Sequence, residues 1–290
     1  MKAEDKLKNW VLFAGLSLIW GSSFILMKIG LNALTAYQVA SLRILSAGVL
    51  LLPVAVKKAR LATVDKLPVI LISGLLGSFF PAFLFCIAET RINSALVGIL
   101  NALTPVFTVL FGITFFSTLV GAKKILGVLI GFTGLCLLVL GKGVPELSYL
   151  SYAFLVVLAT VCYGLNTNVV NRYLKNVKSL EIASLAFGML ILPSLLILFF
   201  TGFFSMDFSV RSLQISVFAS CVLGAFGTAI ASIMYYLLIK SSGTIFTSMV
   251  TYAIPIVAIG WGTLSNEPVI IWEVICLVII LAGVALTAKS

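Results

Sequence analysis

Histidine is absent from this chain and acidic residues are scarce. Its 290 residues include no His and only nine Asp or Glu. None of the nine lies at the centre of a long apolar stretch. Enzymes that act on lipid-linked substrates need general acids and bases or metal ligands inside the membrane. Neither a paired Asp nor an H-x-x-x-H pattern is present, so the sequence argues against an enzyme and predicts neither a metal site nor a cofactor.

Two further absences narrow the function. No G-x-x-x-x-G-K-[ST] motif occurs, so nucleotide hydrolysis is not expected to power the protein. The five cysteines fall singly in separate apolar stretches, without the paired spacing of a zinc site or a disulfide framework. They are interpreted as small core residues. The five are Cys86, Cys136, Cys162, Cys221 and Cys276.

The chain is instead rich in apolar residues. Hydrophobic residues make up 61% of it, charged residues 10%, and the mean hydropathy is +1.22. Too little polar surface remains to cover a soluble core of this size. Lipid is therefore the expected environment for most of the chain.

Ten apolar stretches follow one another with short connections. About 20 apolar residues are needed to cross a bilayer as a helix, and ten such helices use up nearly the whole sequence. We therefore predict an all-α integral membrane protein with ten transmembrane helices. They are expected at residues 10–30, 38–56, 67–88, 94–116, 121–140, 150–171, 180–202, 212–238, 244–264 and 270–288.

The basic residues predict the orientation. With the N-terminus in the cytoplasm, fourteen Lys and Arg fall on the inner side and only Arg91, Lys142 and Arg211 on the outer side. Such a bias in short loops follows the positive-inside rule, so both termini are predicted to be cytoplasmic. The net charge of +10 is explained by this topology and by anionic inner-leaflet lipid, and no nucleic-acid partner is expected.

The chain also repeats itself. A shift of 150 residues aligns Asn101–Phe107 with Thr251–Val257, a shift of 143 aligns Trp20–Ser23 with Tyr163–Asn166, and a shift of 149 aligns Gly134 with Gly283. Two five-helix units are predicted, at residues 1–143 and 144–290. Because five is odd, the second unit is inverted relative to the first. Inverted repeats place a substrate between the halves near the bilayer midplane.

Several short motifs resemble those of the EamA-type family in the drug/metabolite transporter superfamily. They are Trp20–Phe24, Leu42–Arg43, Ser94–Leu96 with Thr104–Val106, and Gly127–Gly134. The resemblance covers essentially the whole chain and implies an exporter-like fold. It places helices 1, 3, 4, 6, 8 and 9 around a central cavity and helices 5 and 10 outside. Family members commonly carry a Glu after helices 4 and 9; Glu267 matches the second, but Ser117–Leu119 replaces the first.

Two prolines, Pro105 and Pro255, occupy matching places in the two units. A proline inside a helix removes one backbone hydrogen bond and kinks the helix. Both are predicted to act as gating hinges beside the cavity. A static kink, satisfied by neighbouring helices, is the alternative.

Polar and aromatic residues inside the apolar stretches are the substrate-binding candidates. Intramembrane polar groups cost free energy unless they are satisfied, and aromatic walls with a polar tip suit amphipathic solutes. Hydrogen bonding between helices and plain core packing remain alternatives for each. The candidates are Trp20, Asn101, Tyr163, Asn166, Tyr235 and Tyr252.

Charged residues near the outer helix ends complete the set. Lys28 and Arg43 either snorkel to the surface or attract a carboxylate or phosphate. Glu89 and Glu273 are the candidates for a proton relay. Because no carboxylate lies at the midplane, neutral, zwitterionic or anionic solutes are favoured over organic cations.

The sequence thus predicts a secondary transporter of the inner (cytoplasmic) membrane. It would move an amino acid or similar small metabolite by alternating access, with export the expected direction. The expected partners are that solute and the lipid bilayer, and the protein would be a monomer or weak homodimer. A nucleotide-sugar or phosphate exchanger of the same fold is the main alternative; a channel or a membrane-embedded enzyme would belong to a different class.

Overall fold

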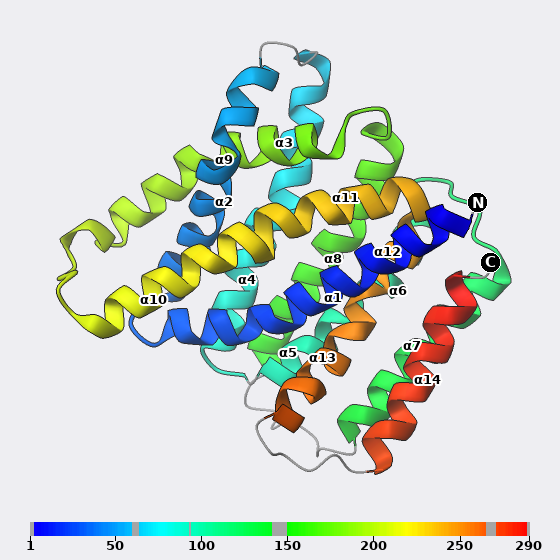
Figure 1. Ribbon diagram of the computed structural model, residues 1–290. Helices are drawn as coiled ribbons and strands as arrows, with labels where there is room; N and C mark the ends of the chain where they lie inside the picture. Colours follow the sequence, from blue (N-terminus) through cyan, green and yellow to red (C-terminus); the bar gives the residue numbers. More distant parts are fainter. Residues whose placement is uncertain (1–2, 60–63, 93, 141–149, 265–270, 289–290) are drawn as a thin grey trace.

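A computed structural model describes residues 3–59, 64–92, 94–140, 150–264 and 271–288, and these ranges contain helices and no strand. The prediction of an all-α protein is therefore confirmed for the described residues (Figure 1). The helices of the first half are α1 (Ala3–Leu31), α2 (Ala36–Ala59), η1 (Val64–Lys66), α3 (Leu67–Gly74), η2 (Leu75–Phe79), α4 (Phe80–Glu89), α5 (Ser94–Asn101), α6 (Thr104–Thr114) and α7 (Ala122–Leu140). Those of the second half are α8 (Leu150–Tyr173), α9 (Ser179–Phe200), η4 (Phe203–Ser205), α10 (Arg211–Val222), η5 (Leu223–Ile230), α11 (Ala231–Ser242), α12 (Thr244–Ser248), α13 (Val250–Leu264) and α14 (Ile271–Ala288).

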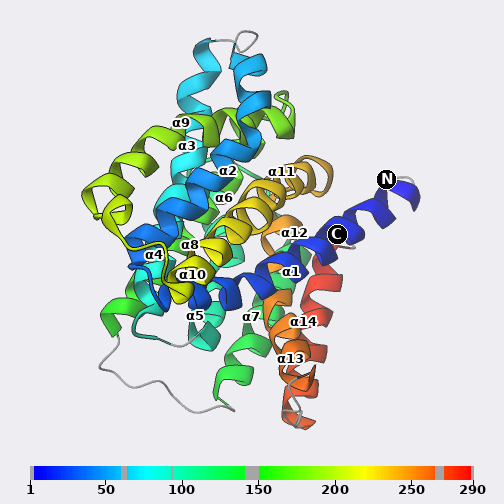
Figure 2. The same cartoon turned by 60° about the vertical axis from the view of Figure 1, so that its left-hand side comes forward.

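Six helical stretches in the described ranges are long and apolar enough to cross a membrane. Shorter apolar helices cover Thr104–Thr114, Thr244–Val257 and Val274–Ala288. The six long stretches are Glu4–Leu31, Ala36–Ala59, Leu67–Glu89, Leu150–Tyr173, Ser179–Phe200 and Arg211–Ser242. The chain is thus a multi-pass membrane protein, while the count of ten spans stays a prediction. The two termini lie close together at one end of the molecule in both views (Figures 1 and 2).

The fourth and ninth apolar stretches are each broken into two helices. α5 ends at Asn101 and α6 begins at Thr104, so Pro105 lies in the first turn of α6 and not in a helix interior. A missing N–H costs nothing there, because first-turn amides have no intrahelical partner. Pro255, by contrast, lies inside α13, and the break before it falls at Met249. The two prolines therefore match in sequence but differ in local structure.

Two other stretches contain a π-helical segment. η2 joins α3 to α4 and η5 joins α10 to α11, each within one continuous helix. A shift of 150 residues places the first segment inside the second. π-segments are rare and recur at functional sites, and both of these lie beside the cavity described below.

Glycines allow α7 and α14 to pack backbone to backbone. The two helices lie side by side in both views (Figures 1 and 2). A Cβ atom on Gly283 would lie 2.5 Å from the carbonyl oxygen of Gly127 and from the amide nitrogen of Gly131. Gly131 also receives the ring of Tyr252, whose hydroxyl donates to the carbonyl of Val128 at 3.0 Å. The Gly-x-x-x-Gly pattern is thus used within the chain, as small residues are in other membrane helices.

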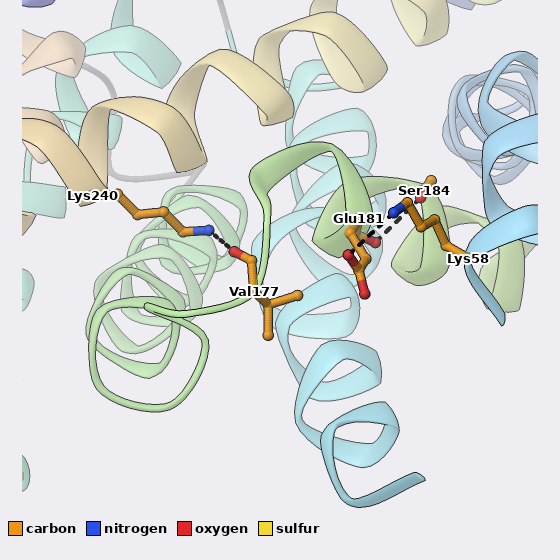
Figure 3. Close-up of polar contacts among 5 residues, drawn as sticks. All are labelled: Lys58, Val177, Glu181, Ser184 and Lys240. Carbon is orange, nitrogen blue, oxygen red and sulfur yellow. Dashed lines mark hydrogen bonds and ion pairs between the residues drawn. The ribbon is translucent and has the colours of Figure 1, made fainter. Parts of the chain in front are cut away.

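Lysines from three elements hold the turn between α8 and α9. Lys240 donates to the carbonyl of Val177, and Lys66 donates to the carbonyl of Tyr173 at 3.3 Å. Lys58 of α2 lies 3.9 Å from the Glu181 carboxylate at the start of α9 (Figure 3). The contacts of Lys66 and Lys58 join the two halves, whereas that of Lys240 lies within the second half.

Removing the Lys58–Glu181 ion pair is expected to change stability little. Both side chains are partly exposed, at 32% and 20%, and ion pairs in such positions contribute about 0–1 kcal/mol. Thermal unfolding of Lys58→Gln in detergent should therefore match that of Lys57→Gln, whose side chain is exposed. A midpoint for Lys58→Gln clearly below that of the control would show that the pair holds the halves together.

Candidate substrate cavity

A cavity lies between the two halves and receives side chains from both of them. Its volume of about 70 Å³ is several times the roughly 10–15 Å³ that one water molecule needs, so it can admit a small solute. The residues that line it are Trp20, Ser23, Phe24, Met27, Arg43, Gly77, Ser78, Phe85, Asn101, Thr104, Tyr163, Asn166, Gly227, Thr228, Ser232, Tyr235, Tyr236, Thr251 and Ile254.

Aromatic rings form the walls. The ring centroids of Trp20 and Tyr235 are 5.3 Å apart, and those of Phe85 and Tyr163 are 5.9 Å apart and stacked. The indole Nε1 of Trp20 donates to the carbonyl of Gly227 at 3.1 Å. The hydroxyl of Tyr235 shares a hydrogen bond of 2.8 Å with that of Thr167. These two hydrogen bonds hold the rings of Trp20 and Tyr235 in place. The cavity thus offers rigid apolar surfaces to a solute.

An amide on α8 is held by contacts from the first half. The Oδ1 of Asn166 accepts a hydrogen bond from Ser73 at 2.7 Å, and Ser73 lies 3.4 Å from the hydroxyl of Tyr236. Gly77 faces the same amide so closely that a Cβ atom there would collide with its Nδ2. Asn166 therefore lines the cavity in a fixed position.

The same close approach occurs in the other half. A Cβ atom on Gly227 would lie 2.7 Å from the hydroxyl of Ser23. Gly77 and Gly227 are matched by the shift of 150 residues, and Ser23 and Asn166 by the shift of 143. In each of these two contacts, a polar side chain from one half meets a π-segment glycine from the other half, and all four residues line the cavity.

One cation reaches the cavity. The Nε of Arg43 donates to the Thr228 hydroxyl of η5 at 2.6 Å. No Asp or Glu is among the described residues that line the cavity. The site is therefore apolar and aromatic, with hydroxyl, amide and guanidinium groups but without a negative charge.

Comparison with known proteins supplies the family. The EamA-like transporter family matches residues 8–140 and again residues 150–289. This chain belongs to the EamA-like transporter family. It is accordingly a membrane transporter, and the resemblance in its motifs is confirmed.

Individual relatives agree with the EamA-like assignment. An "Uncharacterized transporter" of Archaeoglobus fulgidus is 24% identical over 289 residues, covering 98% of this chain and 100% of the relative. The "Uncharacterized transporter YdfC" of Bacillus subtilis is 29% identical over 141 residues, 48% of this chain and 45% of the relative. One crystal structure superposes with a TM-score of 0.75 at 17% identity, over 100% of this chain and 98% of its own. At that identity the match concerns the fold alone.

Most of the predicted binding residues of this EamA-like chain meet at the cavity. Two do not: the side chain of Lys28 is exposed, and that of Tyr252 is buried between α13 and α7. The six that line it are Trp20, Arg43, Asn101, Tyr163, Asn166 and Tyr235.

The predicted hinges and proton relays lie elsewhere. Pro105 and Pro255 are buried but do not line the cavity. Glu89 is half-buried at the end of α4, and the side chain of Glu273 lies outside the described residues.

Sequence reasoning missed the small polar residues and the glycines of the cavity. Gly77, Ser78, Gly227 and Thr228 all come from the π-segments. Their shared Gly-Ser/Thr pair, repeated at 150 residues, was a signal that could have identified them. Ser23 belongs to the Trp20–Phe24 motif, but it has neither the charge nor the aromatic ring by which binding residues were predicted.

Proposed function

We propose that this EamA-like transporter is a secondary carrier that moves a small solute by alternating access. In this proposal ten helices span the cytoplasmic membrane, both termini are cytoplasmic, and residues 1–143 and 144–290 form two inverted repeats. Export is the direction proposed, in keeping with the exporter-like fold that the motifs imply.

One observation carries the proposal: the cavity lies between two sets of matched elements. Ser23 faces Gly227 and Asn166 faces Gly77, so corresponding contacts surround a common centre. A site built by two related halves can be exposed to either side when one half rocks against the other. The nearness of the two termini (Figure 1) supports an even number of spans.

The lining residues favour this proposal over the alternatives. The described lining contains no Asp, Glu, Cys or His, which are among the side chains that most often act as general base in enzymes. Most nucleotide sugars carry two phosphates, whereas Arg43 is the one cation in the described lining.

Counterflow in proteoliposomes tests the proposal. Vesicles would be preloaded with pools of unlabelled amino acids, organic acids, sugar phosphates or nucleotide sugars, and the entry of a labelled member of the same pool would be followed. We expect one pool of small solutes to accelerate entry, because a carrier that returns loaded is faster than one that returns empty.

The control separates a carrier from a channel. Liposomes without protein give the background leak, and saturation is measured from both sides. Flux that is neither accelerated by internal solute nor saturable would favour a channel and contradict alternating access. Acceleration by nucleotide sugars alone would favour the exchanger.

A further inference from the structure

We propose that the cavity binds the carboxylate of a small organic monoanion through Arg43, and that it does not require an ammonium group on the solute. This inference rests on the proposed function, since it names the class of solute that the carrier would take.

The first argument is the unused hydrogen-bonding capacity of Arg43. A guanidinium group has five N–H donors. Its Nε reaches Thr228, but the terminal nitrogens have no hydrogen-bond acceptor among the residues that the structure describes. Arginine presents such terminal donors in a planar fork that matches the two oxygens of a carboxylate.

The second argument concerns charge. The one ion pair found among the described residues joins Lys58 to Glu181 and does not involve Arg43. A cation that faces a membrane-embedded cavity and forms no ion pair among the described residues is costly and marks a functional site. A solute with one negative charge would neutralise it. Lysines do not line the cavity in the described part of the chain, so a doubly charged phosphate would lack a second cation.

The third argument comes from the repeat, which shows what packing requires at this position. Ala40-Ser41-Leu42-Arg43 in α2 matches Ala183-Ser184-Leu185-Ala186 in α9 at the shift of 143 residues. Gly224 packs against the backbone of Arg43. Its counterpart Gly74 packs against Ala186, because a Cβ atom added to Gly74 would lie 3.0 Å from the Cβ of Ala186.

The same helix crossing is therefore built with an arginine in one half and an alanine in the other. Packing needs only the backbone and a small side chain at this place. The guanidinium group occurs in the first half and has no counterpart at Ala186 in the second half. It projects toward the cavity. Thr228 has Ser78 as its counterpart, so the hydroxyl is kept in both halves while the charge is not.

The acceptors of the cavity argue against a need for an ammonium group. Asn166 Oδ1 already accepts from Ser73, Asn101 Oδ1 lies 3.4 Å from the hydroxyl of Thr104, and the carbonyl of Gly227 accepts from Trp20. Without a carboxylate in the described lining, a cationic group would meet Arg43 as a like charge. The rings of Trp20 and Tyr235 suit the apolar remainder of the solute.

Binding to purified protein in detergent tests this inference with four small probes that share a phenyl ring and differ in charge. They are 3-phenylpropionate (anion), 3-phenylpropionamide (neutral), phenethylamine (cation) and phenyl phosphate (dianion). Calorimetric titration of the native chain should show 3-phenylpropionate binding at least tenfold more tightly than each of the other three. In Arg43→Gln its affinity should fall at least tenfold, to that of the amide.

Three variants separate recognition from stability. Arg43→Lys keeps the charge but loses the fork, so part of the preference for the anion should remain even if Arg43→Gln folds poorly. Thr228→Val removes the protein partner of the guanidinium and should retain a preference for the anion over the amide. Arg211→Gln changes an exposed arginine and should bind all four probes like the native chain.

The outcomes are distinct from those of the counterflow experiment. Equal affinity for anion and amide, tighter binding of phenyl phosphate or phenethylamine, or binding of no probe would overturn the inference. Counterflow of neutral solutes with no carboxylate preference would leave the carrier standing and remove the role of Arg43. Tight carboxylate binding without counterflow would support the role of Arg43 and contradict the carrier mechanism.

Discussion

Replacing Gly283 with valine is expected to separate α14 from α7 and to prevent the protein from reaching a stable fold. The added Cβ would lie 2.5 Å from Gly127 O and Gly131 N, and backbone atoms cannot move aside as a flexible side chain can. Overpacking of a core typically costs about 1–3 kcal/mol. A backbone-to-backbone contact lies at or above the upper end of that range, because the two helices must move apart along their length.

Thermal unfolding and size-exclusion profiles in detergent measure this effect. Gly121→Val is the matched control, because Gly121 directly precedes α7 and a Cβ atom there would meet nothing within 4 Å. The control should resemble the native chain, whereas Gly283→Val should elute as aggregate or unfold at a much lower temperature. Equal behaviour of the two variants would show that α7 and α14 are not closely packed.

Replacing Gly77 with valine is expected to abolish transport with a smaller effect on folding. The new side chain would collide with the Asn166 amide, so α8 would have to shift where it lines the cavity. Asn166 also accepts from Ser73, and this bond would be strained or lost. A shift of about 1 Å in a binding site can cost on the order of 100-fold in rate, and we expect a loss of counterflow of that size.

Gly98→Ala is the control for this variant. Its Cβ would meet only Ile254, at 3.9 Å, which is an ordinary contact, so flux should stay close to that of the native chain. Gly227→Val is expected to share the defect of Gly77→Val, because Gly227 meets Ser23 in the corresponding contact. Native flux in Gly77→Val would contradict the assignment of this cavity as the transport site.

The helices could be predicted because apolar composition and length decide them. All ten apolar stretches are helical in the described residues, and their ends lie within about four residues of those expected, except that α1 begins at Ala3, seven residues before the expected start. Their interruptions could not be predicted. The break between Asn101 and Thr104 lies before Pro105, not around it, because a helix tolerates proline in its first turn. The π-segments leave no mark in hydropathy, since they replace one helical form with another.

The site was predicted in part, for a similar reason. Residues such as Trp20 and Asn166 could be predicted as binding residues, because their polar groups cost free energy inside the membrane unless they are hydrogen-bonded. Whether Tyr252 and Lys28 line the cavity depends on which face of each helix points inward. The sequence of a membrane helix that is apolar on all sides does not show which face that is. The sequence leaves the direction of the Arg43 side chain open for the same reason, and the contact of α2 with η5 decides it.

The π-segments also change how a mutational scan of this protein would look. Each residue of an α-helix turns the chain by about 100°, and a π-turn contains an extra residue. The sensitive positions along α3 and α10 should therefore follow one phase, and those along α4 and α11 another, offset by about one residue. A single helical wheel drawn through Leu67–Glu89 or Arg211–Ser242 would assign cavity-facing residues of its second half to the lipid.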